Sequence, residues 1–277
     1  MKNKKMWLEA SLICIIVGVV LLTAGRFMGG IPGFSIDRQG FHAAEDEEYP
    51  EPLKGEMALE EFDSIELDVD YADVELVASD RFAVEYCLAG GSKKPVCKVK
   101  NGKFTFIEGD YFRIVNFNFF TSGRDSSDAH YFVRVEIPRD VTLSKVSMKT
   151  EFGDFDIGTL KAGRMELENE YGDIEMKAAE GRSLRVTLDS GNLTVSRLAV
   201  SETRIENEYG NVDLTAAGDE KEYALDLCTE YGSIRAGGTE KHEDEYSDEI
   251  HYESDGDGKK RIEVYCEMGD INIDSET

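Results

Sequence analysis

Residue types that carry catalysis are scarce in this chain. Its 277 residues include four histidines, one tryptophan and five cysteines. No two cysteines form a CxxC pair, which argues against a zinc or redox site of that kind. GxSxG, HExxH, Walker and dinucleotide-binding motifs are missing from the sequence as well. The sequence therefore predicts a protein that is not an enzyme and needs no cofactor.

Basic residues are also few. The chain has 31 Lys and Arg against 57 Asp and Glu, a net charge of −26. A surface of this charge repels phosphate backbones, so nucleic acid is not an expected partner. It favours cations or cationic ligands instead.

Long apolar runs are limited to residues 6–25, where Glu9 is the one charged residue. At about 1.5 Å per residue, such a run crosses a hydrocarbon core of about 30 Å as one transmembrane helix. Three lysines lie within residues 1–5 and only Arg26 follows closely. The positive-inside rule then predicts a single-pass cell-membrane protein with residues 1–5 in the cytoplasm and the remainder outside. A cleaved signal peptide is the alternative, and it also exports the remainder.

A short motif is repeated along the rest of the chain: an acid and usually an aromatic residue, then glycine, then Asp or Asn. The copies centre on Ala72 (in the glycine position), Gly153, Gly172, Gly191, Gly210, Gly232 and Gly269. The spacing between the glycines from Gly153 to Gly210 is 19 residues, and the later steps are 22 and 37 residues.

Each copy is flanked by alternating apolar residues, seven and five positions before the glycine and two and four after it. This alternation predicts strands with one buried face, and Gly beside Asp or Asn predicts a bend between them. A unit this short cannot bury its apolar face alone, so it stacks on its neighbours. The fold class predicted is all-β, a β-solenoid or stacked β-sandwich of roughly 19-residue units, preceded by the transmembrane helix.

The predicted domain organisation follows from composition. Residues 26–60 are rich in Gly, Pro and acids and predict a linker. Residues 61–277 form the extracytoplasmic repeat domain, in which the acidic segment 237–260 is an insertion that explains the 37-residue step. Cys87 and Cys97 would form a disulfide if they faced each other on a hairpin.

The acidic positions of the repeat are candidates for metal binding. Stacked units place equivalent carboxylates about 4.8 Å apart, where they repel unless cations intervene. Oxygen-rich clusters suit Ca²⁺. The candidate ligands are Asp154, Asp173, Glu170, Glu208 and Asp270. The alternative, which we favour, is that Asp and Asn serve turn geometry and the acids serve solubility. His242 and His251 lie among carboxylates, where they are either transition-metal ligands or part of a solvated acidic loop.

Aromatic residues supply the second kind of candidate. Those that precede the glycine are either a row for ligand stacking or packing at the corner of the solenoid, and packing is the commoner case. They are Tyr71, Phe152, Tyr171, Tyr209 and Tyr231. A separate aromatic-rich stretch predicts an interaction surface, or else a cap over the first coil. Its residues are Tyr111, Phe112, Phe117, Phe119 and Phe120.

Three features together resemble a known family. They are the repeated acid–aromatic–Gly–Asp/Asn unit, the strand–Pro–strand passage Val133–Val146, and an N-terminal helix followed by the glycine-rich stretch 29–40. The chain resembles the bacterial "putative adhesin" family of β-strand repeat proteins, domain of unknown function 4097, over most of residues 60–277. The resemblance implies an envelope protein typical of Gram-positive bacteria and brings no catalytic motif.

The expected function is that of a membrane-anchored, extracytoplasmic β-repeat protein acting as a non-enzymatic binding, adhesion or envelope-stress module. Its expected partners are the membrane, through the N-terminal helix, and an envelope protein or cell-wall polymer. The alternative is a polysaccharide-binding or polysaccharide-cleaving β-solenoid. A cleft with two carboxylates and aromatic residues would favour this alternative, whereas a smooth acidic surface favours the first function.

Overall fold

The computed structural model describes residues 33–37, 40–43, 51–90, 93–109, 113–118, 130–242, 249–256 and 259–276. The chain divides into two compact units, one with residues 1–50 and 112–128 and the other with residues 51–111 and 129–277. The described residues form strands, apart from one 3₁₀ turn at Glu220–Glu222. The predicted all-β fold is therefore confirmed.

The smaller unit contains one antiparallel sheet in the order β2 (Gly40–Ala43), β1 (Gly33–Asp37) and β9 (Arg113–Asn118). Phe117, one of the predicted surface residues, lies in β9 opposite Phe34 of β1. The other four predicted surface residues, Tyr111, Phe112, Phe119 and Phe120, lie outside the described residues.

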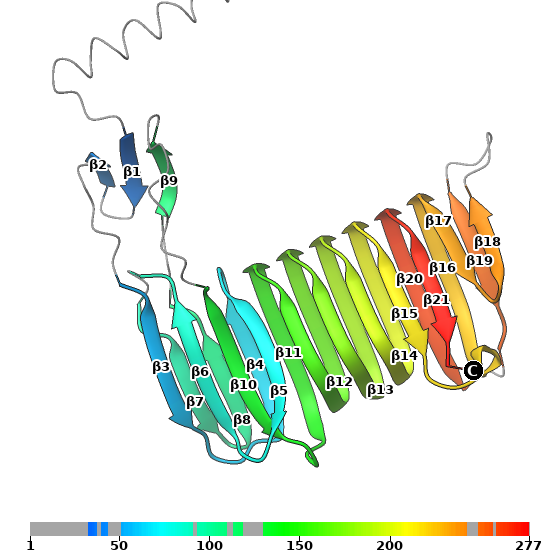
Figure 1. Cartoon of the computed structure of the whole chain (residues 1–277), viewed down its shortest axis with the longest axis horizontal. Coiled ribbons are helices and arrows are strands. Elements are labelled where there is room, and N and C mark those ends of the chain that lie inside the picture. The colour runs from blue at the N-terminus through cyan, green and yellow to red at the C-terminus, as the bar shows by residue number, and fades with distance from the viewer. Residues whose placement is uncertain are drawn as a thin grey trace, which may run out of the picture. The chain divides into compact units, whose positions relative to one another are not determined.

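The larger unit is built from parallel strands stacked in two sheets (Figure 1). The first sheet contains, in spatial order, β4 (Ser64–Val69), β11 (Leu143–Phe152), the second halves of β12 (Phe155–Tyr171), β13 (Ile174–Ser190) and β14 (Leu193–Tyr209), then β20 (Lys260–Met268) and β16 (Tyr223–Tyr231). The second sheet contains β5 (Asp73–Ser79), the first halves of β12, β13 and β14, then β15 (Val212–Ala216), β21 (Ile271–Ser275) and β17 (Ser233–Ala236). One strand from each sheet and the bend between them make one coil.

The 19-residue period sets the register of the middle coils. Ile174 lies opposite Leu193, and Leu193 lies opposite Val212 in the next coil. All three side chains are fully buried, in one apolar cluster that runs through the unit. The positions two and four after each bend are buried in all seven copies, so the predicted inside–outside alternation is confirmed. Burial of such side chains stabilises the fold by about 25 cal/mol per Å² of apolar surface.

The last copy of the repeat does not occupy the last position in space. Strands β20 and β21 lie between the coil of β14 and β15 on one side and the coil of β16 and β17 on the other, as the red strands of Figure 1 show. The coil of β16 and β17 therefore precedes the coil of β20 and β21 in the sequence but follows it in the spatial order of the stack. The 37-residue step is the length of this return path.

Antiparallel strands close the C-terminal end of the larger unit. The segment 237–260, predicted as an acidic insertion, contributes β18 (Thr239–His242), which pairs with β17, and β19 (Ile250–Ser254), which pairs with β16. Both strands lie at the right-hand end of the stack in Figure 1. They cover the open edge that each sheet would otherwise present.

The other end is also covered by strands outside the repeat, of which the first in each sheet is parallel to its neighbour and the next is antiparallel. Strand β10 (Phe132–Pro138) pairs with β5 and with β6 (Ala83–Leu88), and a hairpin of β7 (Val96–Lys100) and β8 (Lys103–Ile107) pairs with β4. Positive φ angles at Asn101 and Gly102 confirm the tight turn expected from Asn-Gly.

One predicted boundary at this end needs correction, and the condition for the Cys87–Cys97 disulfide is not met. Strand β3 (Leu53–Ala58) lies inside the segment predicted as a linker and pairs with β6. It is an edge strand with no fully buried side chain, so it lacks the alternation that marks a strand in the sequence. Cys87 and Cys97 are free thiols, because β6 and β7 are not hairpin partners: β7 pairs with β8 instead.

The segment Met6–Gly25, predicted as a transmembrane helix, lies outside the described residues. Within the part of the chain that the structure describes, no helix is long and apolar enough to cross a membrane.

Candidate functional site

The bends of the seven coils stack into one continuous edge, here called the glycine edge. In spatial order it consists of Ala72, Gly153, Gly172, Gly191, Gly210, Gly269 and Gly232. A Cβ atom on Gly191 would lie 1.9 Å from the carbonyl oxygen of Gly172, and the φ angle of Gly191 is 152°. Only glycine tolerates both the close approach and this backbone conformation. The repeat therefore keeps glycine because neighbouring backbones nearly touch along this edge.

The residues that follow the bends bond from one coil to the next. Oδ1 of Asp154 accepts a hydrogen bond from the backbone N–H of Asp173 at 2.8 Å, and Oδ1 of Asp173 accepts one from Asn192 at 2.7 Å. The bonds continue through Asn192, Asn211 and Asp270. We call these residues the Asx row. They satisfy backbone donors that the bend leaves without a strand partner, as the turn-geometry interpretation of the sequence requires.

Buried polar side chains bond the bend carbonyls from inside. Nδ2 of Asn169 donates to the Gly153 carbonyl at 3.0 Å, Nδ2 of Asn207 to Gly210 at 2.9 Å, and Oγ1 of Thr229 to Gly269 at 2.9 Å. The sequence analysis overlooked this row. Its signal is a polar residue three positions before the glycine, where the alternation predicts an apolar one.

The aromatic residues before the glycines form a second row on the same edge, here called the aromatic row. Three rings stack in parallel: Tyr71 on Phe152, with centroids 5.1 Å apart, and Phe152 on Tyr171, with centroids 5.0 Å apart. Ser190 interrupts the row. It then continues through Tyr209, Met268 and Tyr231.

Solvent reaches the aromatic row. Its side chains are 41–52% exposed, although alternation places Tyr171 on the same side of its strand as the buried Asn169 and Leu167. The buried residues end two positions before the row, at Asn169 in this strand, so the rings project beyond the core. The structure therefore favours an exposed row over packing at the corner, and stacked rings of this kind offer flat apolar faces to a partner.

Carboxylates line the aromatic row on the side of the first sheet, two positions before each bend. They are Asp70, Glu151, Glu170, Asp189, Glu208, Glu267 and Glu230. Partial burial and the charges of Asp70 and Glu170 raise the pKa of Glu151. Lys149 offsets part of this repulsion, since its Nζ lies 3.6 Å from Glu170.

An acidic hollow of about 280 Å³ flanks the row on the side of the second sheet. Its lining combines Asp154 and Asp173 of the Asx row with further charged residues, Asp73, Glu75, Asp156, Glu175 and His130. Nε2 of His130 lies 2.6 Å from Oδ2 of Asp73, a pairing that no spacing in the sequence suggested. Of the predicted metal ligands, Asp154 and Asp173 meet in this hollow, whereas Glu170, Glu208 and Asp270 do not line it.

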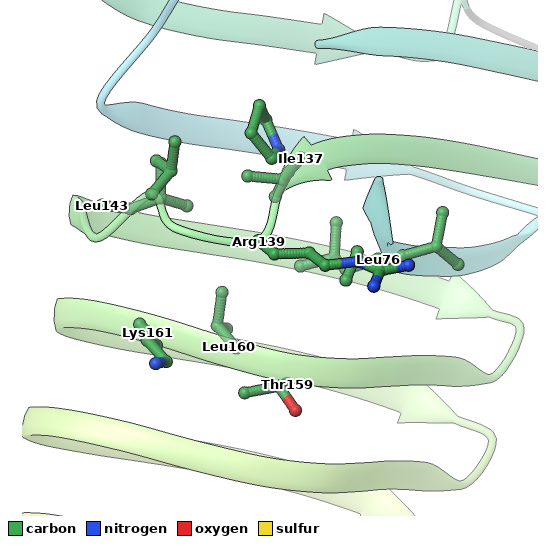
Figure 2. A pocket seen from close by; sticks show the side chains of 11 residues that line it. Leu76, Ile137, Arg139, Leu143, Thr159, Leu160 and Lys161 are labelled. Carbon is green, nitrogen blue, oxygen red and sulfur yellow. The ribbon is translucent and has the colours of Figure 1, made fainter. Parts of the chain in front are cut away.

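A small apolar pocket lies at the opposite edge of the coils (Figure 2). It has a volume of about 230 Å³ and is lined by the ends of β5 and β10, the start of β11 and the middle of β12. Leu76, Ile137 and Leu160 contribute apolar surface, and Arg139 and Lys161 stand at its rim. No acidic side chain lines it, so it lacks the pair of carboxylates that glycoside cleavage requires.

The two stacked sheets, the period of 19 residues and the glycine edge define an all-β repeat domain whose coils are joined by glycine bends. The chain belongs to the Toastrack DUF4097 family, whose model matches residues 62–218 and again residues 202–274. The family resemblance seen in the sequence is therefore confirmed.

Similar solved structures come from bacteria of several genera. A "putative cell adhesion protein" from Clostridium sporogenes is 12% identical, with a TM-score of 0.46 over 82% of this chain and 100% of that one. A "putative adhesin" from Bacteroides fragilis is 9% identical, with a TM-score of 0.30 over 80% and 97%. A "putative lipid binding protein" from Parabacteroides distasonis is 14% identical, with a TM-score of 0.31 over 82% and 97%. A search of curated proteins found no match.

Proposed function

We propose that this protein is a non-enzymatic binding module of the cell envelope and that the glycine edge is its binding surface. The observation that supports this proposal is the aromatic row, which spans seven rungs with half-exposed side chains and is interrupted once, at Ser190. Carboxylates line it on the side of the first sheet and, at the N-terminal end, also on the side of the second sheet. Exposed apolar surface gathered in a line marks interaction sites. Flanking carboxylates select partners that carry cationic groups and repel anionic ones.

The partner in this proposal is an extended basic segment of an envelope protein. The rungs of the edge repeat about every 4.8 Å, which suits a partner that runs along the stack. Arg and Lys side chains would contact both the ring faces and the neighbouring carboxylates.

Cross-linking in intact envelopes tests this proposal. The full-length chain, with an affinity tag, is cross-linked and the captured proteins are compared with those of Y71A/F152A/Y171A. We expect the triple variant to lose the captured protein, because it removes the three stacked rings. M57A is the control, since Met57 is an apolar side chain of similar exposure on β3, outside the row. Equal capture by the triple variant and the control would contradict the proposal.

Polysaccharide binding is the second candidate, and the parallel stack of Tyr71, Phe152 and Tyr171 favours it. Flat rings exposed in a line can stack against sugar rings of a polymer. Co-sedimentation with purified cell-wall polymer distinguishes the two candidates. If the unaltered chain sediments with the polymer and the triple variant does not, the polymer is favoured. If the unaltered chain captures a protein by cross-linking but does not sediment with the polymer, the basic segment is favoured.

The proposal includes the membrane topology expected from the sequence, with Met6–Gly25 as a single-pass anchor and residues 27–277 outside the cell. It rests on the lysines that precede the segment. Labelling of S201C in intact cells with a membrane-impermeant maleimide tests it, because Ser201 is exposed on the larger unit. We expect labelling before lysis, above that of the unaltered chain. Labelling only after lysis would refute the topology.

A further inference from the structure

The pair of strands that closes the C-terminal end of the first sheet brings one imidazole and two carboxylates together, those of His251, Asp226 and Glu253. Strands β16 and β19 are antiparallel, with Asp226 opposite Glu253 and Cys228 opposite His251. Alternation along each strand places these side chains on the same outer face. The imidazole of His251 therefore lies between one carboxylate from each strand.

The distances among the three side chains fit a metal ion. Nε2 of His251 lies 3.1 Å from Oδ1 of Asp226 and 3.5 Å from Oε1 of Glu253. All three donor atoms lie within 4.8 Å of one another. Metal–ligand bonds of 2.0–2.2 Å in a tetrahedral zinc site place neighbouring donor atoms about 3.3 Å apart. The distances of 3.1 Å and 3.5 Å from Nε2 of His251 to the two carboxylate oxygens therefore lie just below and just above the donor–donor distance of such a site.

Hydrogen bonding alone accounts poorly for this arrangement. A single imidazole nitrogen has one proton at most, yet two carboxylate oxygens face it. Arg261 holds the other oxygen of Asp226, with Nη2 at 3.2 Å from Oδ2, and so leaves Oδ1 directed at His251. Support of a ligating carboxylate through its second oxygen is a common feature of metal sites.

The donor set indicates which metal would bind. Imidazole with two carboxylates suits Zn²⁺ and similar transition metals, whereas Ca²⁺ prefers oxygen ligands alone. The thiol of Cys228 is directed elsewhere, since it donates to Oε1 of Glu249 at 2.7 Å. Solvent would supply the fourth ligand, because the imidazole of His251 is 49% exposed.

We propose that Asp226, His251 and Glu253 form a Zn²⁺ site that ties the edge strand β19 to β16. Two ligands come from β19 and one from β16, so the ion bridges the two strands. Metal binding would then stabilise the strand that closes this end of the sheet, independently of what the glycine edge binds.

Zinc titration of the full-length, chelator-treated chain tests the site. We expect ZnCl₂ to raise the melting temperature and Co²⁺ to give the intense visible absorption of a tetrahedral site, at one equivalent per chain. CaCl₂ at the same concentration should not reproduce the rise. A Co²⁺ spectrum of weak, octahedral type, or a rise with Ca²⁺ equal to that with Zn²⁺, would overturn the proposal.

Two variants separate this site from general binding to an acidic surface. H251Q removes the imidazole from an exposed position, and we expect at least a tenfold loss of Zn²⁺ affinity. H130Q is the matched control, since His130 is also exposed and also pairs with a carboxylate, and it should bind Zn²⁺ like the unaltered chain. Unchanged affinity in H251Q, with folding checked by circular dichroism, would refute the site.

Discussion

The middle coils and the two ends of the larger unit are stabilised by different means. From Gly153 to Gly210, one 19-residue unit is repeated with the same parallel register, the same buried positions and the same bend. At both ends, strands from outside the repeat add antiparallel pairings and the repeat spacing changes. Ion pairs occur both between the middle coils and at the ends. One such pair lowers the pKa of Glu136 to about 2, chiefly through a hydrogen bond from Arg81.

This difference follows from the edges that a stack of coils leaves open. A coil in the middle has a neighbour on each side that satisfies its backbone groups, so identical units suffice. A terminal coil exposes unpaired N–H and C=O groups and needs a different strand to cover them. The middle of the unit thus depends on close backbone contact between identical coils, and its ends depend on strands outside the repeat that cover the open edges.

Substitution of a bend glycine should give the largest effect and tests the role of backbone proximity in the middle. In G191A the new Cβ would lie 1.9 Å from a carbonyl oxygen, at a φ angle of 152°. We expect a loss of more than about 4 kcal/mol, or failure to fold, because the next coil must move away. Urea unfolding followed by circular dichroism measures the loss.

Glycine at the C-terminal end provides the contrast. Gly238 also has a positive φ angle, but a Cβ atom added to it would meet no other described atom within 4 Å. G238A should therefore cost only about 1 kcal/mol, for the backbone conformation alone. If G191A and G238A lose equal stability, backbone proximity is not what distinguishes the middle coils.

Charge insertion into the core should give the next largest effect. Ile174 is fully buried between two coils, whereas Ile250 lies in the edge strand β19. I174D should cost about 4 kcal/mol, because it leaves an unpaired charge in the core. I250D should cost about half as much, since only the edge strand must detach.

A substitution on the outer face controls for changes in charge. E175K alters an exposed side chain next to Ile174 and should change the stability by about 0.5 kcal/mol or less. Thermal or urea unfolding of the three variants gives the comparison. Losses of equal size in I174D and E175K would mean that the assigned inner and outer faces are wrong.

The dependence of stability on pH should be a smaller effect, and it comes from the N-terminal end. Glu108 is the one buried carboxyl among the described residues, and burial raises its pKa despite hydrogen bonds from the backbone of Asp70 and Tyr71. The folded state then binds this proton more tightly than the unfolded state does. Stability should rise as the pH falls from neutral towards the ordinary range of glutamate.

Glu136 acts in the opposite direction at lower pH. Its lowered pKa, about 2, means that its contribution is lost as the pH falls from the ordinary range towards 2. We therefore expect the melting temperature to be highest near pH 5. E108Q should flatten the rise between pH 7.5 and pH 5, whereas E202Q, a change of an exposed glutamate, should not. An unchanged slope in E108Q would exclude Glu108 as its source.

The regular part of the fold could be predicted because the period appears directly in the sequence. The spacing of Gly153, Gly172 and Gly191 and the alternation around them determine strand positions, buried faces and register. The placement of β20 and β21 between earlier coils could not be predicted, because all copies present similar apolar faces and any two of them can stack.

The candidate site could be predicted in part. The rows of acids and aromatic residues follow from the repeat, but their exposure depends on where the core ends, two positions before Tyr171. The meeting of His130 with Asp73, and of His251 with Asp226, joins residues 57 and 25 positions apart. Both histidines lie outside the repeated motif, so no periodic signal reveals these contacts.

Binding of Ca²⁺ at the glycine edge should be the smallest of these effects. The Asx row is extended by Asp73, whose Oδ1 accepts a hydrogen bond from the backbone N–H of Asp154. Three carboxylates thus gather at this end, at Asp73, Asp154 and Asp173, whereas the middle is neutral and the other end has Asp270 alone. We expect Ca²⁺ at the charged end, in the acidic hollow, with a dissociation constant of about 1 mM, as in weak extracellular sites. At 1 mM CaCl₂ this gives about 0.4 kcal/mol and a rise in melting temperature of about 1 °C.

NaCl at matched ionic strength controls for screening, which stabilises an acidic protein without any specific site. D173N provides the variant control. Asparagine keeps the acceptor for the next backbone N–H, as Asn192 does for Asn211, and removes one charge from the hollow. We expect CaCl₂ to raise the melting temperature of D173N no more than NaCl at matched ionic strength does. In NaCl, D173N should be as stable as the unaltered chain. Identical melting curves in the two salts would leave the Asx row with a structural role alone, since its hydrogen bonds between coils do not require a metal.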